Sequence, residues 1–245
     1  MLGIIKGDIR YDELSKMVDS VISSELCDFL NIDSLLLPFN GIDEYYNIKQ
    51  SNLNLLDILK ENDIKTIFVG NANNKLKELC NVKNIKLYEL LKMPEFVIDN
   101  AFLTAIGLVA YLNQKSLAIT DQKILIIGFG NIGFELAKVL KAYKCEFSVY
   151  PNTSEEEKFV RLLGYKIADF NDFDIAVNTI PRILEWDYSI FKTKRVIDVA
   201  SAPYGFDINE IYKNDIKYEI VSAIPSKFAP TSAAIIIKKH IANLL

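Results

Sequence analysis

The sequence is poor in the residue types that build several common functional sites. Its 245 residues include only three cysteines, Cys27, Cys80 and Cys145. They are far apart and form no Cys-x-x-Cys pair, which argues against a disulfide framework and against a structural zinc site. An odd number of scattered cysteines also favours a reducing compartment.

Histidine is scarcer still, because His240 is the only one. It lies beside Lys238 and Lys239 near the end of the chain, so we expect a surface residue rather than a catalytic base. A histidine-dependent dehydrogenase dyad and a His-ligated metal site are therefore disfavoured. The sequence also has no Gly-x-Ser-x-Gly motif or Cys/His pairing that would indicate a hydrolase.

Basic clusters and long apolar runs are also missing. The net charge is −4, and no group of Lys and Arg residues indicates a nucleic-acid surface. We find no stretch that approaches the roughly 18 apolar residues of a membrane span. The short apolar run at the N-terminus is followed closely by Lys6, Asp8 and Arg10, unlike a signal peptide. We therefore expect a cytoplasmic protein that binds neither nucleic acid nor membranes.

The sequence does contain alternating strand and helix signals, and half of its residues are hydrophobic. In the first part, polar periodic stretches predict helices at Tyr11–Val21 and at Ser51–Lys60, the latter with Ser51 as its N-cap. Strands that alternate with helices indicate a parallel sheet with helices on its faces. The predicted strands of this part are Leu2–Ile5, Ser34–Leu37 and Thr66–Val69.

Residues Pro94–Gln114 form a long, largely apolar segment without internal proline, which predicts a buried helix between two halves. With no repeat, low-complexity tract or Gly/Ser linker, the halves are expected to pack together. We expect an α/β protein of two domains. The predicted parts are a smaller N-terminal substrate-side domain (1–94), an inter-domain helix and linker (95–120), a Rossmann dinucleotide-binding domain (121–230) and a C-terminal helix (231–245).

The second half has the clearest succession of elements. Predicted helices are Asn131–Lys144, a helix from a Ser154-x-x-Glu157 capping box to Leu163, a short helix capped by Asp207, and Thr231–Leu245. Six predicted strands are Lys123–Ile127, Glu146–Tyr150, Tyr165–Ala168, Asp174–Thr179, Arg195–Ala200 and Lys217–Val221.

A glycine-rich motif, Gly128-Phe129-Gly130-Asn131-Ile132-Gly133, follows the first of these strands and opens a helix. In a Rossmann domain the first glycine allows a tight turn, the second lets the backbone approach a pyrophosphate, and the third lets the helix pack on the strand. The helix N-terminus favours the phosphate charge. Alone, the motif is weak evidence and a structural glycine turn is the alternative. Its place among ordered strand signals predicts a nicotinamide dinucleotide site.

The end of the second strand bears on the choice of dinucleotide. An NAD site usually carries Asp or Glu about 20 residues after the glycines, on the ribose 2′-hydroxyl. Here the tip, Tyr150–Ser154, has no acid, Glu146 lies too early, and the run Glu155–Glu157 is most simply the first turn of a helix. The usual Arg of an NADP site is also missing, so the sequence favours NADP but leaves NAD open. The side chains that could bind a 2′-phosphate are those of Asn152, Thr153 and Ser154.

Two further strand ends fall on the carboxyl edge of the sheet, where ligands of open α/β sheets bind. The fourth strand ends in Asn178-Thr179-Ile180-Pro181, and the fifth continues into Ala200 and Ser201. We expect their backbones to line the nicotinamide end of the cofactor. Ordinary turns after buried strands are the alternative.

Together these motifs resemble the A-subunit family of dipicolinate synthase, NADP-linked dehydrogenase subunits of spore-forming bacteria. The resemblance spans nearly the whole chain and is densest from Lys123 onward. The family is similar in layout to D-2-hydroxyacid dehydrogenases and adenosylhomocysteinase, with two α/β domains and a cleft between them. The matching elements are Gly7-Asp8 with Arg10, Leu37-Pro38, Gly128–Gly133, Asn178–Pro181, Asp198, Ala200-Ser201 with Pro203 and Gly205, and Ala229-Pro230-Thr231.

The resemblance implies an oxidoreductase of dipicolinic acid biosynthesis during sporulation. Such an enzyme oxidises a dihydrodipicolinate-like intermediate to dipicolinate with NADP⁺ as hydride acceptor, alongside a flavoprotein-like B subunit. The departures fall on the substrate side, because Ala105 stands where the family has an acid, Ala202 where it often has a basic residue, and Tyr204 where it has a glycine. The cofactor side is intact.

A substrate with two carboxylates needs cations, and we expect Arg10 and Lys227 to supply them. Arg182 is a further candidate, although a solvated surface charge is at least as good an interpretation. Asp8 follows the first strand and is the candidate proton acceptor. A diverged paralogue that binds nucleotide and a partner without catalysis, suggested by Ala105, and a different small-acid dehydrogenase remain alternatives. The sequence leaves open whether the chain forms a homo-oligomer.

Overall fold

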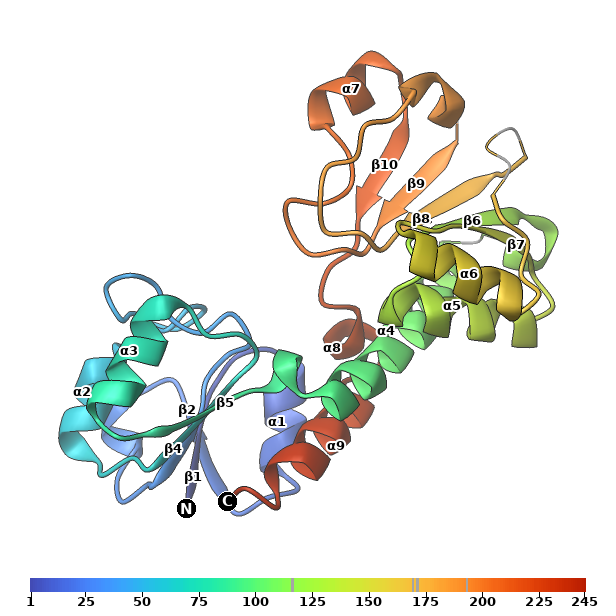
Figure 1. The fold of residues 1–245 in the computed structure, drawn as a ribbon. Coiled ribbons are helices and arrows are strands. Elements are labelled where there is room, and N and C mark those ends of the chain that lie inside the picture. The colour runs from blue at the N-terminus through green and yellow to red at the C-terminus, as the bar shows by residue number, and fades with distance from the viewer. Residues whose placement is uncertain (116, 169, 171, 193) are drawn as a thin grey trace. The chain divides into compact units, whose positions relative to one another are not determined.

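The computed structural model describes residues 1–115, 117–168, 170, 172–192 and 194–245, and the chain forms two compact units. Unit 1 comprises Met1–Asn100 and Pro225–Leu245, and unit 2 comprises Ala101–Ile224. Each unit contains one five-stranded sheet with helices (Figure 1). The predicted α/β class is confirmed.

The sheet of unit 1 has the strand order β2-β1-β3-β4-β5, and all neighbouring strands are parallel. Successive residues of a strand point to opposite faces. Ile4 accordingly lies in one apolar cluster and Ile5 in another. Both faces are covered, which is why these strands read as continuous apolar runs. The elements are β1 (Leu2–Ile5), α1 (Ile9–Ser15), β2 (Ser20–Ser23), β3 (Ser34–Leu36), α2 (Leu55–Glu61), β4 (Thr66–Val69), α3 (Asn74–Val82) and β5 (Lys86–Glu89).

The C-terminal helix α9 (Pro230–Ile241) completes unit 1, although the chain reaches it only after unit 2. It lies beside α1 (Figure 1). Its buried residues Ala234, Ile237 and Ile241 join the apolar cluster that contains Leu2 and Ile4 of β1. The first and last segments of the chain therefore stabilise the same core.

The sheet of unit 2 has the order β10-β9-β8-β6-β7, again with all neighbours parallel. The chain goes from β6 to β7 on one side and then crosses to β8 on the other side of β6. Ligands of such sheets bind at this reversal, beyond the carboxyl ends of the strands. The elements are α4 (Pro94–Gln114, beginning in unit 1), β6 (Lys123–Ile127), α5 (Asn131–Ala142), β7 (Glu146–Tyr150), α6 (Ser154–Leu162), β8 (Ile175–Asn178), β9 (Arg195–Asp198), α7 (Ile208–Lys213) and β10 (Lys217–Ile220). The short helix α8 (Ile224–Phe228) follows, and the chain passes back into unit 1 at Pro225.

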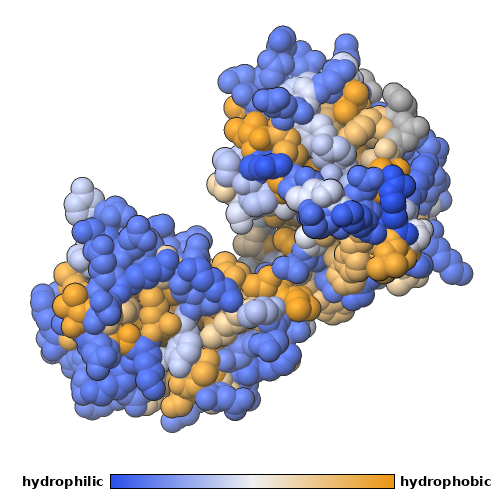
Figure 2. All heavy atoms as spheres, in the orientation of Figure 1, coloured by the Kyte–Doolittle hydropathy of each residue, from blue (hydrophilic) through white to orange (hydrophobic). Residues whose placement is uncertain are grey.

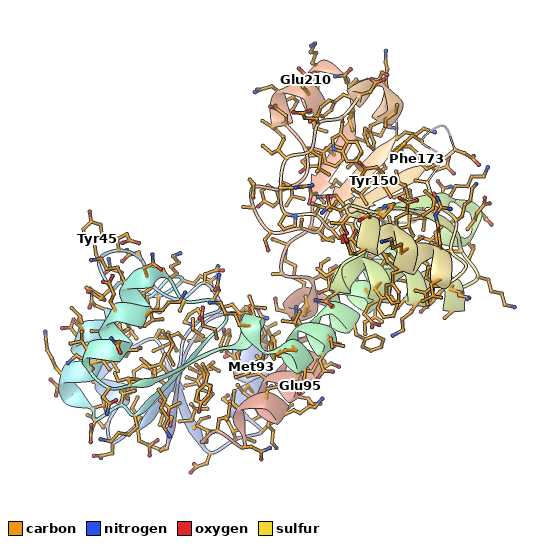
Figure 3. The ribbon with its side chains drawn as sticks, viewed as in Figure 1. Tyr45, Met93, Glu95, Tyr150, Phe173 and Glu210 are labelled. Atoms are coloured by element: carbon orange, nitrogen blue, oxygen red, sulfur yellow. The ribbon has the colours of Figure 1, made fainter. Side chains whose placement is uncertain are left out.

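Aromatic side chains fill much of the unit 2 core. Tyr150, labelled in Figure 3 at the end of β7, contacts Trp186 with a ring distance of 5.2 Å. Trp186 in turn stacks on Phe206, and Phe173 contacts Phe191. Separately, α5 and α6 are joined by the stacked rings of Phe134 and Phe159. The contacts of Trp186 join the end of β7 to the segments that follow β8 and β9.

Several predicted local features were wrong. The predicted helix Tyr11–Val21 is split, because α1 ends at Ser15 and β2 begins at Ser20. The segment Tyr165–Ala168 forms only an isolated bridge between Val149 and Ile167, so the described part of this sheet has five strands rather than six. The N-caps lie elsewhere, at Asn54 rather than Ser51 and at Thr153 rather than Ser154.

The expectation that no segment approaches the length and hydrophobicity of a membrane span was wrong for helix α4. This helix has 21 residues, and an 18-residue window within it has a mean hydropathy of 1.5, which is long and apolar enough to cross a membrane. Half of this window is buried within the fold, and Leu103, Ala105, Leu108 and Leu112 are all core residues. The face of the protein shown in Figure 2 is mainly hydrophilic, with smaller apolar areas. The burial is typical of a core helix.

Replacement of Ile237 by Ala should destabilise unit 1, because this side chain is 1% exposed in its core. We expect the free energy of unfolding to fall by about 2–5 kcal/mol. The matched control is Ile235→Ala on the same helix, where the side chain is 52% exposed, and there the change should stay within about 0.5 kcal/mol. Urea titrations followed by circular dichroism would measure both, and equal effects would contradict the placement of α9.

Candidate functional site

The glycine loop between β6 and α5 lies at the reversal point of the unit 2 sheet. Gly128 has φ +91°, a conformation that favours glycine. A Cβ atom there would lie 2.6 Å from Thr179 Oγ1 and from Ile180 Cγ1. The loop therefore packs tightly against the segment that follows β8.

Gly133 lets α5 pack on the loop that precedes it. A Cβ atom at this position would lie 2.1 Å from the carbonyl oxygen of Gly128. Such an approach is excluded for any other residue. The helix axis is thereby fixed with its N-terminus at the carboxyl edge of the sheet.

Gly130 differs from both, because a Cβ atom there would meet nothing within 4 Å. This residue is the N-cap of α5 and provides no side-chain cap. The first N–H groups of a helix have no acceptor within the helix, and they carry its positive dipole end. Open space in front of uncapped amides fits the diphosphate of a dinucleotide. The residues present thus fit the cofactor that the sequence predicts.

The segment after β8 owes its shape to Asn178, whose side chain is fully buried. Its Nδ2 donates to the carbonyl of Ile180 and to Asp198 Oδ1, each at 3.0 Å. The hydroxyl of Thr179 donates to the carbonyl of Ile127 in β6 at 2.9 Å. The side chains of Asn178 and Thr179 are therefore occupied within the fold, as are the N–H groups of Thr179 and Ile180. The segment Asn178–Pro181 can line a ligand site as a wall of fixed shape.

Asp198 organises the neighbouring loop, a role that its place in the sequence does not reveal. Its carboxylate accepts hydrogen bonds from the N–H groups of Ala200 and Gly205 and from the Tyr218 hydroxyl, at 2.9–3.0 Å. Burial raises the pKa of Asp198 above its usual range. These three donors and Asn178 Nδ2, the fourth, fix the course of the loop that carries Ala200 and exposed Ser201.

An acid from the first turn of α6, Glu156, binds the tip of β7. Glu156 Oε2 accepts hydrogen bonds from the N–H of Asn152 at 2.6 Å and from the N–H of Phe129 at 2.9 Å. Thr153 is used as the N-cap of α6, accepting from the N–H of Glu156. The Asn152 side chain accepts from Arg182 Nη2 at 2.7 Å. The sequence between Tyr150 and Ser154 contains no acid. The expectation that no carboxylate lies near this tip was nevertheless wrong, because the fold brings Glu156 to it.

Asp8 and Arg10, predicted as proton acceptor and carboxylate ligand, are partners of each other. Arg10 Nε donates to Asp8 Oδ1 at 2.8 Å and Nη2 to Oδ2 at 2.6 Å. Asp8 also caps α1, accepting from the N–H of Arg10. The Arg10 guanidinium lies 4.1 Å from the ring centre of Phe39 and is largely buried. The pair therefore has a structural role in unit 1, since Asp8 caps α1 and Arg10 packs on Phe39.

Lys227 lies on α8 and is exposed, within the same unit as Asp8 and Arg10. The predicted cofactor residues all belong to unit 2. His240 is not the surface residue that we expected, because its side chain is 9% exposed and contacts Asp99 Oδ2 at 3.0 Å. It packs edge-on against Phe96 and joins α9 to α4. This placement gives His240 a structural role.

Comparison with known proteins agrees with this geometry. Residues 107–181 match the family described as D-isomer specific 2-hydroxyacid dehydrogenase, NAD binding domain. The matched segment contains the glycine loop and the turn after β8. The chain is also 25% identical over 258 residues to the A subunit of dipicolinate synthase of Bacillus subtilis, covering 97% of this chain and 86% of that protein.

Solved structures give the same result for the fold. Dipicolinate synthase A chains from Bacillus subtilis and Bacillus halodurans both superpose with a TM-score of 0.81 at 22% identity. They cover 99% of this chain, and the matches span 94% and 96% of theirs. The resemblance to the dipicolinate synthase A chains is confirmed. Salmonella D-lactate dehydrogenase follows with a TM-score of 0.62 at 12% identity, covering 99% of this chain and 95% of its own. The family match and these relatives support an oxidoreductase that binds a nicotinamide cofactor.

Replacement of Gly130 by Val should weaken cofactor binding and leave the fold intact. The position is open and has an ordinary φ of −71°, so the larger side chain meets the cofactor rather than the protein. We expect the dissociation constant to rise by at least about tenfold, a loss of about 1.4 kcal/mol. Calorimetric titration of a variant with native circular dichroism would measure it. Unchanged affinity would contradict the assigned site.

Proposed function

We propose that the chain binds a nicotinamide dinucleotide at the carboxyl edge of unit 2 and acts as a dehydrogenase of the dipicolinate synthase A type. The observation that carries this proposal is the open cradle at Gly130, in front of the uncapped N-terminus of α5. The backbone of the glycine loop, Gly128–Gly133, would hold the diphosphate. The turns at Asn178–Pro181 and Ala200-Ser201 would line the nicotinamide end.

The proposed reaction is the oxidation of a dihydrodipicolinate-like compound to dipicolinate. The nicotinamide, when bound, accepts a hydride from the substrate ring, and a proton leaves the same ring. Asp8 is the candidate to receive that proton. Its hydrogen bonds from Arg10 fix the position of its carboxylate.

Two cations are proposed to bind the substrate carboxylates. Arg10 is held in place by Asp8 through Nε and Nη2, and Nη1 is the guanidinium nitrogen that Asp8 does not use. Lys227 is exposed on α8 and can act as a simple point charge. A flavoprotein-like partner, corresponding to the second component of dipicolinate synthase, is part of this proposal.

A second candidate is a paralogue that binds nucleotide without catalysing this reaction. Ala105, which stands where the related family has an acid, is fully buried in α4. The position therefore serves the core of this chain. Ala202 likewise offers no charge where a basic residue is often found. The missing basic residue would weaken binding of a substrate with two carboxylates, and the missing acid removes a candidate proton-transfer group.

Replacement of Lys227 by Ala should weaken substrate use. A charge-assisted hydrogen bond to a carboxylate contributes about 1.5–3 kcal/mol, so KM should rise about tenfold or more. Cofactor affinity should not change, because the cofactor residues lie in unit 2. Lys238→Ala, another exposed lysine of unit 1, is the matched control. An equal KM for the two variants would show that Lys227 does not bind the substrate.

One assay decides between the two candidate functions. It combines the purified protein, NAD⁺ or NADP⁺, and dihydrodipicolinate generated in situ, with and without the flavoprotein-like partner. Dipicolinate absorbance reports the product. We expect product formation that depends on the cofactor. Protein that binds cofactor but forms no product under any of these conditions would favour the paralogue.

A further inference from the structure

The carboxylate of Glu156 joins two segments that meet at the adenosine end of the proposed site. One is the glycine loop, through the N–H of Phe129, and the other is the tip of β7, through the N–H of Asn152. In Rossmann domains the adenosine ribose lies between these same two segments, and an acid there binds the 2′-hydroxyl. That acid usually comes from the second strand itself. Here it comes from the first turn of the following helix.

Glu156 has acceptor capacity left for a ribose. A carboxylate offers about four acceptor sites, and the two backbone donors both use Oε2. The side chain is half-buried, and the Thr153 cap fixes the start of α6 from which it projects. Its neighbours in the acidic run face elsewhere, since Glu157 pairs with Arg161 and Glu155 is exposed. Of these three acids, Glu156 is the one that reaches the glycine loop.

Arg182 supplies the opposing charge at the same tip. Its Nη2 donates to the side-chain oxygen of Asn152, and the backbone N–H of the same residue donates to Glu156. A 2′-phosphate entering here would meet both residues, one attractive and one repulsive. Glu156 is the better placed of the two, because it is half-buried and fixed by two backbone donors, whereas Arg182 is exposed and screened by solvent.

We infer that Glu156 is the specificity-determining residue of the cofactor site and gives this chain a preference for NAD over NADP. The inference rests on the proposed function, and it opposes the NADP preference predicted from the sequence of the β7 tip. The carboxylate accepts a hydrogen bond from the ribose 2′-hydroxyl of NAD. It repels the phosphate that replaces this hydroxyl in NADP.

Calorimetric titration of the full-length protein with NAD⁺ and with NADP⁺ tests this directly. We expect NAD⁺ to bind at least about tenfold more tightly, a difference of about 1.4 kcal/mol. Glu156→Gln should strengthen NADP⁺ binding about tenfold and weaken NAD⁺ binding a few-fold, which removes or reverses the preference. Adding Arg182→Ala to this variant should cancel the gain for NADP⁺, because Arg182 is then the charge that attracts the phosphate.

The matched control is Glu155→Gln, which removes the same charge from an exposed position one residue away. It should leave the ratio of the two affinities unchanged. A wild-type preference for NADP⁺, or a Glu156→Gln variant with an unaltered ratio, would overturn the inference while the dinucleotide site itself stands. Failure of the wild-type protein to bind either cofactor would instead refute the proposed function.

Discussion

The contact between Gly133 and the carbonyl oxygen of Gly128 governs the geometry of unit 2. A Cβ atom at Gly133 would come within 2.1 Å of that oxygen, so α5 can approach the end of β6 this closely only with glycine. The contact directs the uncapped N-terminus of α5 at the reversal point of the sheet. The buried last residues of β8 and β9, Asn178 and Asp198, fix the two turns that follow these strands. The candidate site is thus made mostly of backbone, held by residues that do not themselves reach a ligand.

The parts of the structure that local sequence rules describe were predicted well. The strand at Lys123–Ile127, the glycine motif and the helix that follows form a continuous local unit, in which each residue is explained by its neighbours along the chain. The apolar runs of unit 1 are similar, because strands covered on both faces need no partner to be recognised. β2 was missed because Ser20–Ser23 is short and partly exposed, and it forms a strand only by pairing with β1.

The parts that depend on contacts across the sequence could not be predicted. Glu156 meets the N–H of Phe129, which lies 27 positions earlier, and counting along the second strand does not find such an acid. The mutual pairing of Asp8 and Arg10 was also missed, although the residues are two apart, because their spacing says nothing of which way the side chains turn. His240 looked like part of a charged surface, and its burial against Phe96 arises only from the packing of α9 on α4.

The central claim is that the backbone of the glycine loop binds a nicotinamide dinucleotide. Backbone amide NMR spectra of the protein, recorded with increasing NAD⁺, test it most directly because each amide reports separately. We expect the largest shifts at Phe129–Gly133 and at Asn152, with the core strands of unit 1 unaffected. Saturating NAD⁺ that shifts none of these amides, or only amides of unit 1, would contradict the account.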